Sequence, residues 1–168
     1  MLRFNSDHKF KIMQIADTQE IPAVSPDTLS LINNALDREK PDLVIFTGDQ
    51  IKGYSKKFKK DPAIIEGTID TLVEPIAKRN IPFMVTYGNH DAQCGVDNRG
   101  QYKFYAKYDN FISGDLRNAD DVGTADIQIY SSTEDKPVFE LYIIDSHGKA
   151  KDGAGYAPVD KKQIEWYV

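Results

Sequence analysis

Three short polar segments each follow an apolar run in this sequence, and together they offer the side chains of a metal or phosphate site. The segments are Asp17-Thr18-Gln19, Gly48-Asp49-Gln50 and Gly88-Asn89-His90-Asp91. Carboxylate and amide oxygens are hard ligands that suit divalent cations, and an imidazole can bind metal or transfer protons. The repetition of such side chains after three apolar runs indicates one shared site.

The apolar runs are predicted to be strands of one parallel sheet. They lie at residues 10–16, 43–47 and 81–87, and the second run lacks polar alternation, which is typical of a strand covered on both faces. Helical patterns at residues 25–40 and 61–79 separate them, and each begins with a capping Ser or Asp before a proline. The order β-α-β-α-β predicts parallel pairing with right-handed connections. Open α/β sheets hold their sites at the carboxyl ends of such strands.

After the third strand the sequence no longer alternates strand and helix. A helix, a two-stranded hairpin and a last helix are predicted at residues 101–111, 127–144 and 158–167. The second strand of the hairpin ends in Asp145-Ser146-His147, which is a fourth polar strand end. A short edge strand at residues 2–4 is predicted to lie beside the first core strand.

Composition and charge narrow the classes of function. The 168 residues carry a net charge of −5, and the pI near 5.2 argues against the basic surface that nucleic-acid binding needs. Cys94 is the single cysteine, so no intrachain disulfide can form. No run has the length of a membrane span, and the first ten residues lack the apolar core of a signal peptide. We therefore expect a cytoplasmic protein without nucleic-acid or membrane partners, although a signal peptide removed earlier would leave the same sequence.

The polar segments resemble the motifs of the calcineurin-like metallophosphoesterases. That family's pattern is Asp-x-His, Gly-Asp, Gly-Asn-His-Asp/Glu, a further His and Gly-His-x-His. The stretch 46–51, Phe-Thr-Gly-Asp-Gln-Ile, is most similar to the branch related to purple acid phosphatases. The resemblance covers residues 10–91 well and extends more loosely through 141–166. It implies an α/β fold, the family's α-β-β-α sandwich, with residues 1–168 as the N-terminal half of a metallophosphoesterase domain.

The resemblance also implies a binuclear metal site with two divalent ions, for which Mn, Fe, Zn and Mg are all open. Asp17 and Gln19 would bind the first ion, Asp49 would bridge the two ions, and Asn89 would bind the second. Tyr54 is not assigned to this site, because its spacing from Asp49 differs from that of the metal-bound tyrosine of purple acid phosphatases.

The implied activity is hydrolysis of a phosphorylated substrate by a phosphatase or phosphodiesterase. A metal-bridging hydroxide would attack phosphorus in line, and the metals would stabilise the developing charge. By resemblance, His90 would contact the phosphate and assist the leaving group, and Asp91 would orient His90. Both residues are therefore the candidate catalytic residues.

Two departures from the family pattern limit what the resemblance implies. Gln19 stands where the family has His, and an amide oxygen is a weaker and harder donor than imidazole, so metal preference or occupancy should change. The Gly-His-x-His block is absent, since the other histidines are His8 and His147. The chain also stops at Val168 within an apparent helix. We therefore expect a fragment with an incomplete site, little or no activity of its own, and exposed sheet surface that an oligomer would cover.

Each polar segment also has a purely structural interpretation. Asp17 could cap a turn, Asp49 could lie in an ordinary glycine turn, and Asp91 could be a surface carboxylate. His147 could be a replacement ligand or a solvated loop residue, and the lysine-rich stretch 56–60 could steer an anionic substrate or be solvated. The competing function is a non-catalytic scaffold domain that binds a partner or a ligand, which the absent histidines favour.

Overall fold

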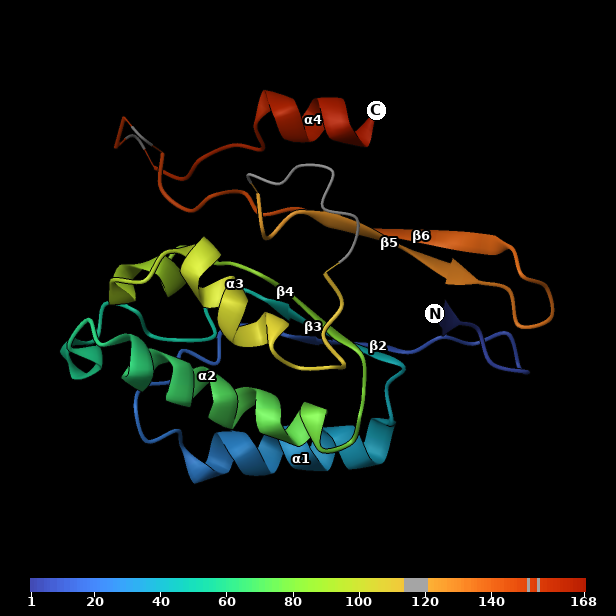
Figure 1. Cartoon of the computed structure of the whole chain (residues 1–168), viewed down its shortest axis with the longest axis horizontal. Coiled ribbons are helices and arrows are strands. Elements are labelled where there is room, and N and C mark those ends of the chain that lie inside the picture. The colour runs from blue at the N-terminus through green and yellow to red at the C-terminus, as the bar shows by residue number, and fades with distance from the viewer. Residues whose placement is uncertain (114–120, 151, 154) are drawn as a thin grey trace.

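A three-stranded parallel sheet carries the three polar segments (Figure 1). In the computed structural model its strands are β2 (Ile12–Ile15), β3 (Leu43–Thr47) and β4 (Phe83–Thr86), hydrogen-bonded in that order. The predicted pairing is confirmed, but β2 is less buried than a core strand, because it has a partner on one side only among the described residues. The structure describes residues 1–113, 121–150, 152–153 and 155–168.

Two helices cover one face of this sheet and begin where the sequence predicted. In α1 (Pro26–Glu39) the Ser25 hydroxyl accepts a hydrogen bond from the N–H of Asp27, and in α2 (Pro62–Ala77) the Asp61 carboxylate does the same for Ala63. Each cap satisfies a backbone donor that the first turn leaves free, and the proline behind it needs no such partner. Each helix connects one strand of the sheet to the next.

The third helix starts earlier and ends earlier than predicted. It is α3 (Asn98–Ala106), whereas the aromatic pattern predicted residues 101–111. The carboxylate of Asp97 accepts a hydrogen bond from the N–H of Gly100 at 2.7 Å, which fixes the start of the helix. Within α3, Tyr105 is fully buried against Phe46 of β3, with ring centroids 6.4 Å apart. The aromatic residues of this segment thus indicated that the helix is packed against the core, while the Asp97 cap decided where the helix begins.

A second sheet lies over the other face of the first. Its strands are β1 (Leu2–Arg3), β5 (Ala125–Tyr130) and β6 (Pro137–Ile143), and the predicted hairpin of β5 and β6 is confirmed as an antiparallel pair. The prediction that residues 2–4 pair with the first core strand is wrong, because β1 runs parallel to β5. The guanidinium of Arg3 explains this choice, since it donates to the backbone carbonyl of Ser131 at 2.6 Å.

The two sheets face each other across a shared apolar layer. Leu43, Ile45 and Met84 from the first sheet meet Ala125, Ile127 and Ile143 from the second. A last helix, α4 (Lys161–Tyr167), lies on the outer face of the second sheet, where Trp166 and Tyr167 contact the ring of Tyr142. The architecture is therefore the predicted α-β-β-α sandwich (Figure 1), with α1, α2 and α3 in one outer layer and α4 in the other.

Apolar side chains are exposed on β6. Val138 and Phe139 are 55% and 50% exposed, and β6 is the last strand of its sheet among the described residues. An oligomer that covers this surface stays a prediction. Within the described ranges, no helix combines the length and the apolar character that crossing a membrane would need.

Candidate metal centre

The loops that follow β2 and β3 continue side by side beyond the strands. The N–H of Asp17 donates to the carbonyl of Gly48 at 3.0 Å, and the N–H of Gln19 donates to the carbonyl of Asp49 at 2.9 Å. The hydroxyl of Thr18 adds a bond to the carbonyl of Gln50 at 2.7 Å. The first two predicted ligand segments are therefore held in register with each other.

The backbone at these positions has an uncommon conformation. Asp17, Gln19 and Asp49 have φ angles of 54°, 44° and 53°, which is the left-handed region. Such conformations cost side-chain-bearing residues roughly 1–2 kcal/mol each, and Asp tolerates them better than Gln. Backbone strain of this kind concentrates at functional sites, where the surrounding structure enforces it. The same conformation also occurs at helix ends and turns such as Lys40 and Asn80, so the backbone alone does not separate a functional site from an ordinary turn.

Two glycines allow the loops after β3 and β4 to touch. A Cβ on Gly48, whose φ is 109°, would lie 2.5 Å from the backbone nitrogen of Gly88, and a Cβ on Gly88 would lie 2.1 Å from Oδ1 of Asp49. The same Oδ1 accepts the N–H of His90 at 2.9 Å. The other oxygen of Asp49 has no hydrogen-bond donor among the described residues. The second and third predicted segments are thus in direct contact through Asp49, with one carboxylate oxygen left for a ligand.

The Asp91 carboxylate lies beneath this contact and is fully buried. Its Oδ2 accepts the N–H groups of Asp49 and Gly88, each at 2.8 Å, and its Oδ1 accepts the N–H of Ile51 at 3.3 Å. Burial raises its pKa from 3.8 to about 6, while the three backbone bonds lower it and the neighbouring Asp49 charge raises it. The interpretation of Asp91 as a surface carboxylate is wrong, because this side chain ties two strand-end loops together.

The imidazole of His90 has a partner other than the predicted one. Its Nδ1 lies 3.1 Å from Oε1 of Gln93, whereas the hydrogen bonds of Asp91 go to backbone N–H groups. The turn that brings Gln93 under the ring is the 3-10 helix η2 (Asp91–Cys94). Sequence reasoning missed Gln93, because it lies outside the family motif; its spacing of three residues from His90 was the available signal. The predicted orientation of His90 by Asp91 is not the contact found.

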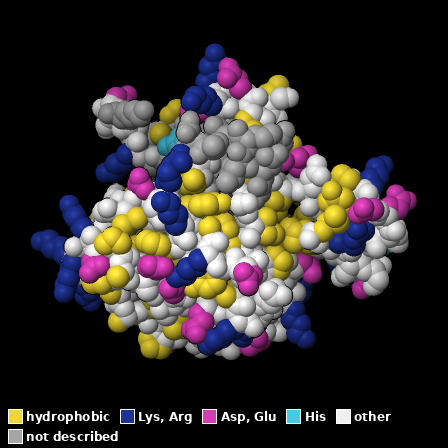
Figure 2. All heavy atoms as spheres, in the orientation of Figure 1, with side chains coloured by type: hydrophobic (Ala, Val, Ile, Leu, Met, Phe, Trp, Pro, Cys, Tyr) yellow, Lys and Arg dark blue, Asp and Glu magenta, His cyan; other side chains and the backbone are white. Residues whose placement is uncertain are grey.

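A lysine-rich segment lies next to His90. The ring of Tyr54 packs against the imidazole with centroids 4.7 Å apart, and the 3-10 helix η1 (Lys56–Phe58) follows. Phe58 is buried and anchors the segment, while Lys56, Lys57, Lys59 and Lys60 are exposed. Figure 2 shows Lys and Arg side chains gathered over this segment at the left of the view. Both interpretations of these lysines, substrate steering and simple solvation, remain open.

The fourth strand end adjoins the third but is occupied by a polar network. A Cβ on Gly148 would lie 3.3 Å from Cα of Asn89. Ligand atoms of Asp121, Asp145 and His147 lie within 4.8 Å of one another. Amide groups from Asn98 and Gln163 already donate to the two carboxylates, at 3.1 Å to Asp145 and 2.6 Å to Asp121. This cluster therefore serves to fasten the loop and α4 to the sandwich.

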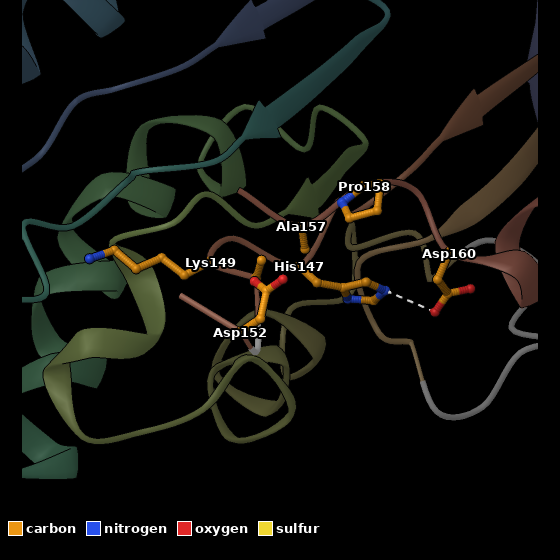
Figure 3. A pocket seen from close by; sticks show the side chains of 7 residues that line it. His147, Lys149, Asp152, Ala157, Pro158 and Asp160 are labelled. Carbon is orange, nitrogen blue, oxygen red and sulfur yellow. Dashed lines mark ion pairs between the residues drawn. The ribbon is translucent and has the colours of Figure 1, made fainter. Parts of the chain in front are cut away.

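His147 projects from this cluster into a hollow of about 630 Å³ (Figure 3). Its Nε2 lies 3.4 Å from a carboxylate oxygen of Asp160, the residue that caps α4. The imidazole is thus paired with a helix-cap carboxylate. A role for His147 as a replacement ligand stays a prediction.

Residues 10–166 match the model of the calcineurin-like phosphoesterase family, and the chain belongs to this family. It is 28% identical over 195 residues to the protein named "Probable inactive purple acid phosphatase 14" of Arabidopsis thaliana, covering 99% of this chain and 47% of that protein. It is 31% identical over 188 residues to "Phosphatase DCR2" of Saccharomyces cerevisiae, covering 98% of this chain and 32% of that protein. The chain thus spans about half the length of these curated relatives or less.

A solved structure confirms the fold. The crystal structure of a dimetal phosphatase from Danio rerio has a TM-score of 0.57 and 15% identity, covering 94% of this chain and 50% of that one. The family implies divalent metal ions, and the donors at the strand ends suit them, because two carboxylates and two amides give an all-oxygen set. The assignment of Asp17, Gln19, Asp49 and Asn89 as the ligands stays a prediction.

The Gly88→Ala substitution tests the contact between the second and third loops. The added methyl group would collide with the Asp49 carboxylate and displace it, so we expect metal affinity to fall at least about tenfold. Overpacking of this kind also destabilises a protein by about 1–3 kcal/mol. Calorimetric titration with manganese and urea denaturation measure the two effects.

Gly67→Ala is the matched control, because a Cβ at this α2 position meets nothing within 4 Å. This change should leave metal affinity unaltered and raise stability by about 0.5–1 kcal/mol, since alanine favours a helix interior over glycine. Wild-type metal affinity in Gly88→Ala would contradict the predicted role of the contact.

The raised pKa of Asp91 predicts how the stability of the metal-free protein depends on pH. Between pH 3.8 and about 6 the folded protein keeps a proton that the unfolded chain releases. This group's contribution is therefore fully present below pH 3.8 and is lost as pH rises through about 6. The shift corresponds to roughly 3 kcal/mol. In Asp91→Asn this component is absent, so the stability of wild type relative to the variant should fall between pH 4 and pH 7 in urea denaturation. A stability difference that does not change with pH would show that Asp91 ionises normally.

Proposed function

We propose that the protein is a metal-dependent phosphoester hydrolase whose metal ions bind at the carboxyl ends of β2, β3 and β4. The observation that carries this proposal is the direct linkage of the three polar segments. Backbone bonds hold Asp17 beside Gly48, and the Asp49 carboxylate accepts the N–H of His90. Membership of the calcineurin-like phosphoesterase family supports the reaction class.

The proposed metal ligands are those implied by the family pattern. Asp17 and Gln19 would hold one divalent ion and Asn89 a second, with Asp49 shared between them, since one of its carboxylate oxygens has no hydrogen-bond donor among the described residues. Two divalent ions bound there would supply Lewis-acid stabilisation and an activated water. An all-oxygen set favours Mn²⁺ or Mg²⁺ over softer ions, although Fe and Zn also occur with carboxylates.

The chain's own contribution to the reaction would centre on His90. Its backbone is fixed to Asp49 and its ring is half-buried, so the imidazole would lie beside a phosphate held at the metal ligands. There it would contact phosphate oxygen and give a proton to the leaving oxygen. Asp91 would act indirectly, because its three bonds to backbone N–H groups keep the loops of Asp49 and His90 in place. The exposed lysines around η1 would attract an anionic substrate.

The competing proposal is a non-catalytic domain that keeps the scaffold and binds a partner or ligand. Two observations favour it: Gln19 stands in place of the family histidine, and three relatives carry the name of a probable inactive purple acid phosphatase. In this case metal binding could persist while turnover is absent.

Metal titration and hydrolysis assays distinguish the two proposals. For the natural protein that carries these 168 residues, we expect manganese-dependent hydrolysis of p-nitrophenyl phosphate or bis(p-nitrophenyl) phosphate. Asp49→Asn should lower turnover at least about a hundredfold, because it removes the shared carboxylate. Asp109 is exposed, so Asp109→Asn serves as the matched control. It should change neither metal binding nor turnover.

Three results would count against the enzyme proposal. Metal binding without hydrolysis would favour the non-catalytic domain. Full activity in Asp49→Asn would disprove the assignment of Asp49. An absence of metal binding would reject the metal centre itself.

A further inference from the structure

The imidazole of His90 is held by a residue that the family pattern does not contain. Gln93 lies three residues further along η2, and its Oε1 is 3.1 Å from Nδ1 of His90. At its other end, Nε2 of Gln93 donates to the backbone carbonyl of Asn89 at 3.1 Å. The amide thus bridges a predicted metal-ligand residue and the imidazole of its neighbour.

This bridge decides which ring nitrogen carries the proton. A backbone carbonyl can only accept a hydrogen bond, so the NH₂ group of Gln93 must face Asn89. Oε1 then faces the ring, and an amide oxygen can only accept. Nδ1 of His90 must therefore be the donor, and in the neutral ring Nε2 is the nitrogen without a proton.

A second contact restricts the ring from its side. Tyr54 packs against the imidazole with an interplanar angle of 62°. Gly53 allows the loop that carries Tyr54 to approach His90 closely, because a Cβ at position 53 would lie 2.0 Å from the carbonyl oxygen of His90. The N–H of Lys52 donates to the carbonyl of Glu20 at 2.8 Å, which anchors the same loop to the segment after β2.

We propose that Gln93 is the positioning residue for His90, holding the Nδ1–H tautomer so that Nε2 faces the substrate. The catalytic consequence of this proposal rests on the proposed hydrolase function. The contacts that hold the ring do not depend on that function. If His90 acts as the general acid, the protonated imidazolium would give its Nε2 proton to the leaving oxygen while the P–O bond to that oxygen breaks, and the ring would be left as the neutral Nδ1–H tautomer. Nδ1 keeps its own proton throughout, so the ring needs no rotation or tautomer exchange after the transfer.

Nitrogen-15 NMR of the metal-free protein tests this directly, because protonated and unprotonated ring nitrogens resonate in separate regions. At a pH at which the imidazole is neutral, wild-type His90 should show a protonated Nδ1 and an unprotonated Nε2. Gln93→Ala and Gln93→Met both remove the acceptor, and the ring should shift to the Nε2–H tautomer that an unconstrained imidazole favours in water. Gln93→Glu gives up the hydrogen bond to the Asn89 carbonyl but still offers the ring an oxygen that can only accept, so it should retain Nδ1–H.

Gln128→Ala, an exposed position on β5, is the matched control and should leave His90 unchanged. In the active protein, Gln93→Ala should lower kcat about tenfold or more with little change in KM. This loss is part of the roughly 10²–10⁴-fold rate enhancement that a positioned general acid contributes. A wild-type ring with Nε2–H, or an Nδ1–H tautomer that survives in both Gln93→Ala and Gln93→Met, overturns the proposal. Because the tautomer is read without substrate or metal, this outcome is independent of whether the protein hydrolyses phosphoesters.

Discussion

The hydrogen bonds between the buried Asp91 carboxylate and the backbone after β3 and β4 set the shape of the whole strand-end region. One carboxylate accepts N–H groups from Asp49, Gly88 and Ile51, which belong to two different loops. Charge-assisted bonds of this kind contribute roughly 1.5–3 kcal/mol each. Burial outweighs these bonds and raises the pKa of Asp91 to about 6. Asp91 therefore fixes geometry at a cost in stability, which is a property of functional sites more than of ordinary turns.

The features around this carboxylate are consistent with one another. Left-handed backbone at Asp17, Gln19 and Asp49 turns the polar segments away from the strands, and the glycines at 48 and 88 let the loops approach closely. Helices α1 and α2, each begun by a side-chain cap and a proline, connect the paired strands that deliver these segments. The site therefore depends on local signals that are strong in the sequence. It also depends on contacts between loops, and the sequence does not indicate those contacts.

The sequence was sufficient for most of the fold. Apolar runs, caps and prolines predicted β2, β3, β4, α1 and α2, because each signal is local. The pairing of β1 with β5 was missed, since it depends on the distant carbonyl of Ser131 that Arg3 reaches. The candidate site residues were assigned through motif resemblance, whereas the burial of Asp91 and the contact of Gln93 with His90 depend on how η2 folds against the loop after β3. The spacing of three residues between His90 and Gln93 was a signal of their contact, but spacing does not reveal that Asp91 is buried.

From these contacts we infer that the three linked strand ends form a binuclear metal centre. A crystal structure of the manganese-soaked protein, with anomalous scattering to locate the ions, tests it most directly. We predict two ions about 3.5–4 Å apart, as in two-metal sites, bound by Asp17, Gln19, Asp49 and Asn89 with Asp49 touching both. Manganese found instead at Asp121, Asp145 and His147, or absent from the ends of β2, β3 and β4, would contradict the account.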